Sequence, residues 1–558
     1  MGSPTVGGGG GWITIPFIIA TMAGLTLAAG GWINNLIVYL ITEFNVASID
    51  ATQIFNVVNG CSAMFPILGA ILADSFLGCF SVIWISSFFS LLGIILLTLT
   101  ATVNNLRPVP CVHDESALCE GPSKVQYAVL YVAITLATIG LGGTRFTLAT
   151  MGADQLDKPK QQQSFFNWFI FTLYTSSMVS VIAIVYVQDN VSWGLGFGLC
   201  VAANLVGLAL FLLGGRLYRR VKPQGSPFAG LARVVVAAIR KRRTSGSSDS
   251  ERYYNFMHKR PQEELGADPT PSSFFKFLNK AALKTDGDVN ADGSIANPWK
   301  LCTVQQVEDL KVLIKLFPLW STGIFLATPL AIQSSLAVLQ ALAMDRHLGH
   351  HFKIPAGSMF VFVLMSVSLT IILLDRLLYP LIKHLIGRST TPLERIGVGH
   401  FINVLSMAVS ALVESRRLKE SALKPMSMPV LWLAPQLVLA GIGEAFHFPG
   451  NSGLYYQEFP DSLKSTATAA LAMFIGIAFY LSTAIVGVLR RSTDWLPDNI
   501  DQGRMDIVFW LLFGIGLLNF GYYLVCAHFY KYRVLDDDTT GEVMIKNING
   551  DRDDQDSA

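Results

Sequence analysis

Long apolar stretches separated by short polar segments dominate the chain. A helix needs about 20 consecutive apolar residues to cross the hydrocarbon core of a bilayer. The pattern therefore predicts an all-α, polytopic membrane protein with twelve transmembrane helices, over 16–41, 52–73, 80–101, 127–150, 165–187, 192–214, 304–343, 354–382, 392–413, 430–448, 466–488 and 506–530.

The seventh stretch, 304–343, is too long for a single crossing. It begins with an amphipathic segment, Val307 to Lys315, and contains Pro318 and Pro329. Proline removes a backbone donor and disturbs a helix interior. We therefore expect a helix that is broken or that projects beyond the bilayer.

The predicted helices form two groups of six around a polar segment. We expect six-helix bundles over 16–214 and 304–530, joined by a solvated cytosolic linker over 215–303, with an N-terminal cytosolic segment over 1–15 and an acidic cytosolic tail over 531–558. Positive charge near span ends favours the cytosolic side. The linker carries Arg216, Arg219, Arg220 and the basic run 240–243, so both termini are predicted to lie inside.

A weak internal sequence similarity supports the interpretation that the two halves are related. Gly140-Leu-Gly142 in the fourth span resembles Gly441-Ile-Gly443 in the tenth. Repeated halves place a substrate site near the bilayer midplane, between them. The alternative is coincidence, because glycine pairs are common in membrane helices.

Composition and charge exclude several classes of protein. Only 14% of the residues are Asp, Glu, Lys or Arg, against roughly 25% in soluble domains. The net charge of +2 gives no bulk attraction to nucleic acid. No nucleophile with a base, phosphate-binding loop or metal-ligand spacing is present, so we expect neither an enzyme nor a cofactor.

Cysteine positions allow one disulfide. Cys111 and Cys119 share the loop between the third and fourth spans, which would face outward in the predicted orientation. A disulfide can persist there, although close spacing does not establish its geometry. The pairing therefore stays open.

Two ionisable residues lie deep within predicted spans. Arg145 in the fourth span and Glu444 in the tenth are at similar depth, which fits an ion pair across a central cleft. Intramembrane charges are costly and are functional candidates by default. Arginine presents a planar fork of donors that suits a small oxyanion, and a glutamate can change its protonation state. The alternative is a permanent buried pair that stabilises the fold.

Further polar residues in the spans are weaker candidates for substrate binding. His447 follows Glu444 by three positions and so shares its helix face. Asn35 and Tyr39 in the first span and Gln333 in the seventh extend the set. For Asn35, Tyr39 and Gln333 a hydrogen bond to a neighbouring helix is the favoured alternative, and for His447 it is packing within the core.

Ordered motifs resemble the proton-coupled oligopeptide transporter family of the major facilitator superfamily, in its plant nitrate/peptide branch. The resemblance covers most of residues 12–535 and is greatest to the nitrate excretion transporter subgroup. The segments that carry it are Gly10-Gly-Trp-Ile-Thr-Ile-Pro-Phe17, Gly142-Gly-Thr-Arg145, Gly152-Ala-Asp-Gln155, Phe165-Phe-Asn-Trp-Phe169, Gln188-Asp-Asn-Val-Ser-Trp-Gly194, Asn297-Pro-Trp-Lys-Leu-Cys-Thr303, Met344-Asp-Arg346, Ile354-Pro355 and Gly441-Ile-Gly-Glu444.

The resemblance implies roles for three charged residues. Arg145 stands where the family usually has a lysine in helix four, which is implicated in substrate and proton coupling. Glu444 matches the glutamate of helix ten, its salt-bridge and gating partner. Asp74 matches the acidic residue of a loop motif that acts in gating. The basic residue expected after Gly78 is Cys79, so this motif is incomplete.

The largest departure from the family lies in the first span. The family's Glu-x-x-Glu-Arg motif falls on Met22, Leu25 and Thr26, so all three ionisable residues of the proton relay are lost. Arg145 is then less neutralised, which favours a bound anion. The histidine that a plant relative uses for nitrate aligns with Leu330, which leaves Arg145 as the expected ligand.

The resemblance implies a plasma-membrane transporter that moves nitrate by alternating access, with low affinity, a capacity for efflux and altered proton coupling. The expected partners are a small anion, a possible proton and the lipid bilayer. Chloride, or an organic anion, hormone or glucoside, is the alternative substrate, and the vacuolar membrane is the alternative location. A membrane sensor or scaffold is the alternative of another class.

Overall fold

The computed structural model describes residues 5–6, 9–109, 121–221, 227–243, 253–254, 271–285, 287–290, 293–350, 352–458 and 464–530. Cys111 and Cys119 lie outside these residues, as does the acidic tail. The chain forms two compact units, each described by itself. The first comprises Met1–Gly225, Thr322–Gly450 and Ala469–Tyr522, and the second comprises Ser226–Ser321, Asn451–Thr468 and Tyr523–Ala558.

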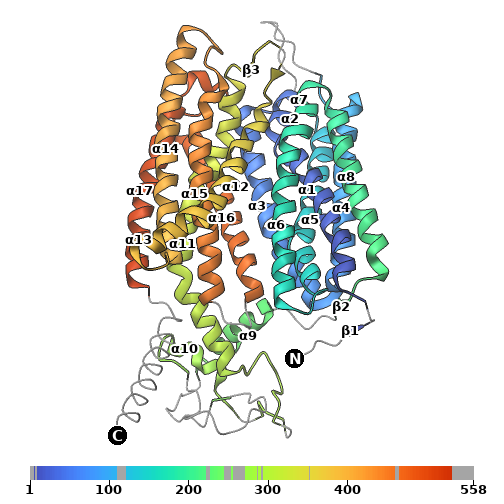
Figure 1. The fold of residues 1–558 in the computed structure, drawn as a ribbon, viewed down its shortest axis with the longest axis vertical. Coiled ribbons are helices and arrows are strands. Elements are labelled where there is room, and N and C mark those ends of the chain that lie inside the picture. Colours follow the sequence, from blue (N-terminus) through green and yellow to red (C-terminus); the bar gives the residue numbers. More distant parts are fainter. Residues whose placement is uncertain are drawn as a thin grey trace. The chain divides into compact units, whose positions relative to one another are not determined.

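Long helices make up the first unit (Figure 1). The first half of the chain contributes α1 (Ile15–Ile33), α2 (Leu36–Thr42), α3 (Ser48–Leu72), α4 (Gly78–Thr102), α5 (Lys124–Ala153), α6 (Pro159–Val179), α7 (Val185–Asn190) and α8 (Trp193–Leu213). The second half contributes most of α11 (Val304–Leu342), α12 (Val361–Leu373), α13 (Tyr379–Ile386), α14 (Pro392–Leu423), α15 (Ala434–Glu458), α16 (Lys464–Ser492) and α17 (Met505–Phe529).

The prediction of a polytopic helical protein is confirmed. Eleven helical runs among the described residues are long and apolar enough to cross a bilayer. One of them, Ser48–Thr102, contains both α3 and α4, which are separated by a π-helical turn at Ala73–Leu77. Gly78 ends this turn with a φ of 74°, a conformation that glycine adopts without strain. The run therefore accounts for the second and third predicted spans.

The seventh span is one continuous helix rather than a broken one. With 39 residues, α11 is about 58 Å long, which exceeds the roughly 30 Å of a bilayer core. Pro318 and Pro329 lie within it without dividing it into separate helices. Of the two outcomes predicted, projection beyond the bilayer is the one that fits.

Two short antiparallel strand pairs complete the first unit. Strand β1 (Thr5–Val6) pairs with β2 (Arg220–Val221), so Thr5 lies opposite Val221. Strand β3 (His347–Leu348) pairs with β4 (Phe352–Lys353) in the connection that follows α11. The N-terminal pair is extended by Gly10 and Gly11, whose amides donate to the carbonyls of Leu217 and Gln155.

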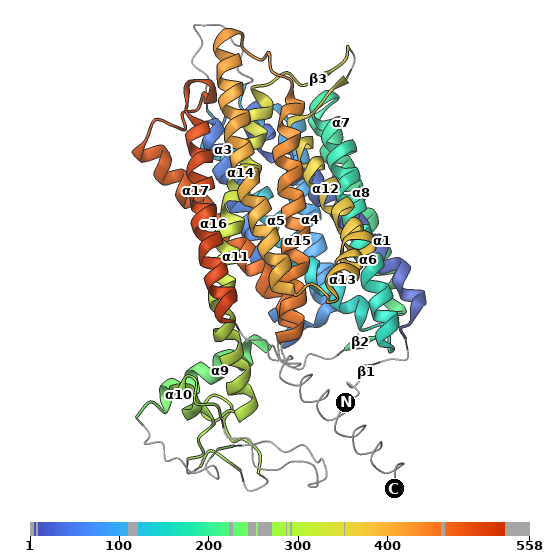
Figure 2. The ribbon, with the colours of Figure 1, turned by 60° about the vertical axis from the view of Figure 1, so that its left-hand side comes forward.

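Tight helix contacts through glycine determine how α5 packs. A Cβ on Gly143 would lie 1.9 Å from the Ser86 hydroxyl of α4, and one on Gly142 would lie 2.4 Å from the Cβ of Phe65 on α3. Small residues let membrane helices approach this closely. Both neighbours therefore press on α5 one turn before Arg145, and α5 lies among the other long helices in both views (Figure 2).

The second unit contains α9 (Pro227–Arg240), α10 (Lys276–Asn279) and the start of α11. Apolar residues of these helices form a small core that includes Val234, Ala237, Leu278 and Val307. Lys241 forms a buried ion pair with Asp288, with Nζ and Oδ2 2.6 Å apart. The described part of the predicted linker is thus packed rather than fully solvated, because α9 carries its apolar residues on one face.

Candidate functional site: a cavity lined by both halves

A cavity of about 340 Å³ lies in the first unit, between helices of the two halves. Its size falls within the range of about 300–1,000 Å³ that is typical of small-molecule sites. The first half supplies α1, α5 and α6, and the second half supplies the start of α12 and α15. The lining residues are Met22, Leu25, Thr26, Ala29, Gly30, Ile33, Asn34, Leu141, Thr144, Arg145, Leu148, Leu173, Tyr174, Ser177, Phe360, Leu364 and Glu444.

Arg145 faces this central cavity from α5. Its lining neighbours on that helix are Leu141, Thr144 and Leu148, a spacing that defines one helical face. The Arg145 side chain is exposed although it lies deep in the helix, because the cavity provides the accessible space. The guanidinium therefore keeps its donors available to a small ligand.

Helix α1 presents a face without charge to the same cavity. Met22, Leu25, Thr26, Ile33 and Asn34 recur at helical spacing along it. The three positions at which the family's relay residues are replaced thus lie on the cavity wall. Arg145 consequently has no carboxylate from α1 near it.

Glu444 reaches the cavity from α15, on the opposite half of the molecule. Within the described residues it forms no ion pair or side-chain hydrogen bond with Arg145, in contrast to the predicted pair. The Tyr174 phenol on α6 is close enough to interact electrostatically with both charges. The two charges thus share one cavity while each remains open to another partner.

Asn35 and Tyr39 were predicted to bind substrate, but they lie outside the central cavity. The Asn35 side-chain amide donates to Oε1 of Gln188 at 3.2 Å. The Tyr39 hydroxyl is 2.9 Å from that of Thr100, and its ring packs against Phe44, Trp193 and Phe197. Both residues are fully buried in helix contacts.

Gln333 and His447 also lie outside the cavity. Nε2 of Gln333 donates to the hydroxyls of Ser406 and Ser410 on α14, each at 2.8 Å. The His447 ring is 5.2 Å from that of His400, also on α14, and packs closely against Gly399. The alternative roles, in which these residues join neighbouring helices, fit their positions.

Asp74 lies in the turn between α3 and α4, away from the central cavity. It interacts electrostatically with Asp154, which caps the end of α5. Burial first, and then the charge of Asp74, raises the pKa of Asp154 to about 6, while Arg219 opposes this shift. Arg219 also forms an ion pair with Asp157, 2.5 Å between Nη1 and Oδ1, which holds the pKa of that carboxyl below its usual range.

Two ion pairs join the halves, one of them near the connections that follow α7 and α11. Nη1 of Arg346 is 2.9 Å from Oδ2 of Asp189, and both side chains are mostly buried. Arg490 at the end of α16 pairs with Asp50 at the start of α3. We call these two pairs the clamp, because each links a residue of the first half to one of the second.

Several cavity residues are absent from the sequence prediction. Asn34 could have been found by extending the helical spacing from Met22 along α1. Tyr174, Ser177 and Phe360 carry no comparable signal, because they stand in apolar and aromatic runs like any packing residue. Within the described residues, no cluster of His, Cys, Asp and Glu could hold a metal ion.

Known proteins share this architecture and sequence. The family model described as the POT family matches residues 80–500. The protein NRT1/PTR FAMILY 2.7 of Arabidopsis thaliana is 55% identical over 539 residues, covering 95% of this chain and 94% of that protein. NRT1/PTR FAMILY 2.6 of the same plant is 53% identical, with 94% of each chain covered.

Solved structures agree on the fold. The crystal structure of the POT family transporter PepTSo has a TM-score of 0.70 and 17% identity, covering 92% of this chain and 98% of that one. An auto-inhibited POT family peptide transporter has a TM-score of 0.67 at 17% identity, covering 93% and 97%. These relatives are transporters rather than enzymes. The chain belongs to the POT family.

Proposed function

We propose that this POT-family transporter moves nitrate by alternating access through the central cavity. One observation carries the proposal: Arg145 is accessible and has no ion-pair partner among the described residues, in a cavity whose α1 wall contributes no carboxylate. A charged group in a site of low polarity is stabilised by an opposite charge. A small planar oxyanion matches the planar fork of a guanidinium.

Glu444 acts in this proposal as an internal competitor for Arg145. While Glu444 is ionised, its charge cancels that of Arg145, and the cavity attracts an anion only weakly. Protonation of Glu444 leaves the cavity positive and favours anion entry, so transport is stimulated by acid without the relay on α1. The accompanying proton movement is therefore altered relative to relatives that keep the relay.

Location, direction and gating follow the same proposal. The chain resides in the plasma membrane, or alternatively the vacuolar membrane, with both termini in the cytosol. Transport has low affinity and runs outward where the gradients favour it, as in the nitrate excretion subgroup. Asp74 contributes to gating at the turn between α3 and α4.

Nitrate flux into proteoliposomes tests the role of Arg145. Purified wild-type protein and Arg145→Ala are reconstituted in equal amounts and orientation, and flux is measured at pH 5.5 and 7.5. We expect the variant to lose at least about 90% of the flux, since a charge-assisted hydrogen bond of about 1.5–3 kcal/mol disappears. Arg416→Ala is the matched control, because Arg416 pairs with Glu420 on α14 outside the cavity.

The same preparation separates the alternative functions. Undiminished flux in Arg145→Ala removes Arg145 from the mechanism. If chloride, or a larger carboxylate such as a plant hormone, moves faster than nitrate, that solute is the substrate in place of nitrate. Ligand binding without flux of any solute supports the sensor or scaffold.

A further inference from the structure

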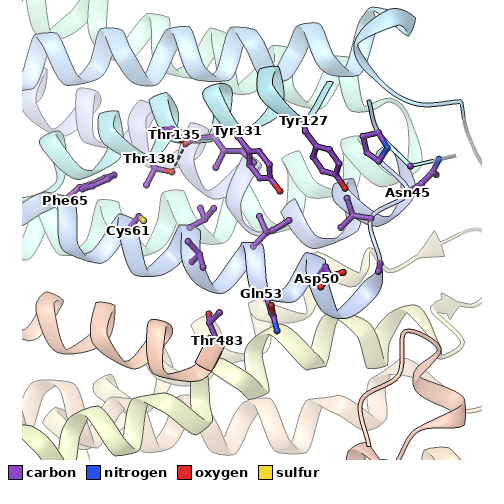
Figure 3. Close-up of a pocket in the computed structure, with 18 residues that line it drawn as sticks. Asn45, Asp50, Gln53, Cys61, Phe65, Tyr127, Tyr131, Thr135, Thr138 and Thr483 are labelled. Carbon is purple, nitrogen blue, oxygen red and sulfur yellow. Dashed lines mark hydrogen bonds between the residues drawn. The ribbon is translucent and has the colours of Figure 1, made fainter. Parts of the chain in front are cut away.

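A second and larger cavity, of about 730 Å³, lies between α3 and α5 and shares no lining residue with the central cavity. One face of α3 lines it through Asp50, Gln53, Ile54, Val57, Val58, Cys61 and Phe65. One face of α5 lines it through Tyr127, Tyr131, Ile134, Thr135 and Thr138, and Thr483 of α16 closes one side (Figure 3). We call this space the α3–α5 cavity.

The two helices are in close contact at one end of the cavity. Near Phe65 they are pressed together, since a Cβ on Gly142 would collide with that residue and one on Gly69 would lie 2.9 Å from Gly143. Toward the start of each helix the lining includes the large side chains of Tyr127 and Tyr131. The lined face from Asp50 to Phe65 is about 22 Å long at 1.5 Å per residue.

The chemistry of the lining changes along this length. Val57, Val58, Phe65 and Ile134 form an apolar wall at the narrow end. At the other end, Tyr127 and Tyr131 stack with ring centroids 5.6 Å apart and planes inclined by 9°. Figure 3 shows both phenols directed from α5 toward α3, which carries Asp50 near this end. Tyr131 is 44% exposed, so the cavity is open to a ligand from outside.

The charges at the aromatic end favour a cation. Asp50 is the one charged side chain among the described lining residues. Its partner Arg490 also pairs with Asp498, at 3.1 Å, so these three residues together carry one negative charge. Aromatic faces attract ammonium groups, and a neighbouring carboxylate adds to that attraction. An anion such as the substrate of the central cavity is disfavoured here.

We propose that the α3–α5 cavity binds an amphiphile with an ammonium head group. The head lies against Tyr127, Tyr131 and Asp50, and the hydrocarbon chain lies along the apolar wall toward Phe65. Membrane lipids with choline or ethanolamine heads and soluble alkylammonium compounds share this chemistry. The site shares no lining residue with the central cavity, but it shares Asp50 with the clamp.

Calorimetric titration with dodecyltrimethylammonium tests the site in full-length protein held in phosphatidylglycerol nanodiscs. We expect saturable binding that weakens about tenfold in Asp50→Asn and in Tyr131→Ala, the size expected for a cation–π contact or a close charge. Asp498→Asn is the control for the first variant, because it removes the other partner of Arg490 but does not line the cavity. Tyr522→Ala is the control for the second, since that tyrosine is 42% exposed on α17.

Cys61 provides a test that needs no variant. Its thiol lines the cavity, so dodecyltrimethylammonium should slow its alkylation by a maleimide, while dodecanoate of the same chain length should not. Cys526 on α17 is the internal reference. Equal protection by dodecanoate, or unchanged affinity in both Asp50→Asn and Tyr131→Ala, overturns the proposal.

Changing the lipid identifies the source of the head group. If a membrane lipid is the occupant, replacing phosphatidylglycerol by phosphatidylcholine with the same acyl chains weakens dodecyltrimethylammonium binding and protects Cys61. If the occupant is a soluble alkylammonium, the affinity is the same in both lipids. Either result supports the ammonium site, whereas protection of Cys61 by phosphatidylglycerol alone contradicts it.

Discussion

Arg145 and Glu444 line the same central cavity, which the Tyr174 phenol also lines. The balance between these two charges decides what the central cavity attracts. Because Met22, Leu25 and Thr26 add no charge, this balance depends on one acidic and one basic side chain. Because the arginine stays charged, a change of protonation at Glu444 changes the net charge of the lining by a full unit.

Glu444→Gln should therefore make the cavity permanently positive. We expect the KM for nitrate at pH 7.5 to fall about tenfold, which corresponds to ~1.4 kcal/mol for one removed charge. The acid stimulation of flux should disappear as well. Flux measured in proteoliposomes over a pH series checks both effects. A variant that keeps the wild-type ratio of flux at pH 5.5 and 7.5 would show that Glu444 does not control anion entry.

Asp154 gives a stability test outside the membrane-spanning helices. Burial and Asp74 raise its pKa to about 6, so the folded state holds this proton more tightly than the unfolded chain does. The resulting stabilisation is complete below the ordinary carboxyl range and is lost as the pH rises through about 6. Asp154→Asn should then unfold at a higher temperature than wild type at pH 7.5, by up to roughly 3 kcal/mol in free energy.

Thermal unfolding in detergent at pH 4 and 7.5 measures this effect. Asp157→Asn is the control, because Arg219 lowers the pKa of Asp157 and the sign is reversed. That variant should lose stability at pH 7.5 relative to wild type. If Asp154→Asn is equally destabilising at both values of pH, the pKa of Asp154 is not raised in the folded protein.

Residue type and depth alone predicted part of the site. Arg145 and Glu444 stood out because charges inside apolar spans are rare, and both line the cavity. Four other polar residues in the spans were also predicted to bind substrate, but their side chains contact neighbouring helices instead. These residues are Asn35, Tyr39, Gln333 and His447. Which neighbour faces a given side chain depends on helix rotation, and twelve apolar helices with weak amphipathic patterns leave that rotation undetermined.

Helix α14 contains a buried ion pair that sequence inspection missed. Arg417 is 1% exposed and donates from Nε and Nη2 to the Glu414 carboxylate, at 2.8 and 2.7 Å. Gln340 of α11 donates to the same carboxylate at 2.7 Å, and Asp501 accepts from Nη1 of Arg417. Each nitrogen of the Arg417 guanidinium thus has an acceptor, so this ion pair stabilises the helix contacts.

Glu414→Gln should destabilise the protein by about 3 kcal/mol, because the buried Arg417 would lose the negative charge beside it and would face an NH2 group in place of one accepting oxygen. Glu420→Gln on the same helix is the matched control. Its pair with Arg416 is solvent-exposed and should contribute less than about 1 kcal/mol. Chemical or thermal unfolding of both variants in the same detergent compares them. Equal losses would mean that burial of the Glu414 pair adds nothing.

The prediction of helices succeeded where that of their continuity did not. Runs of apolar residues identified every long helix of the bundle, because the bilayer requires such runs. The unbroken course of α11 past Pro318 and Pro329 was not predictable, since neighbouring helices can compensate for the lost backbone donors. The packed core around α9 and α10 was missed because it depends on contacts with residues of α11 that are distant in sequence.

For the whole molecule, the proposed alternating-access mechanism would give the clamp a role in selecting one conformational state. Arg346–Asp189 and Arg490–Asp50 join the halves, so the two halves cannot separate there while both pairs persist. Alternating access requires that these two ion pairs break and form again during each transport cycle. The strength of the clamp therefore sets how much of the population is closed at this end.

Asp189→Asn should shift the population toward the state that is open at the clamp. Loss of one partly buried ion pair of about 1–2 kcal/mol changes the equilibrium constant roughly 5- to 30-fold. Spin labels placed on the two halves and measured by double electron–electron resonance report the distance distribution. Asp345→Asn is the control, because Asp345 pairs with His347 within one connection and does not join the halves. An unchanged distribution in Asp189→Asn would exclude the clamp as a determinant of state.

The contact between Cys61 and Tyr480 has a practical consequence. The sulfur lies 3.0 Å from the tyrosine hydroxyl, and the two residues come from opposite halves, on α3 and α16. Any movement that parts these helices removes the tyrosine hydroxyl from the sulfur and leaves the half-buried thiol more accessible. The rate at which a reagent modifies the Cys61 thiol should therefore increase with the frequency at which the two halves separate.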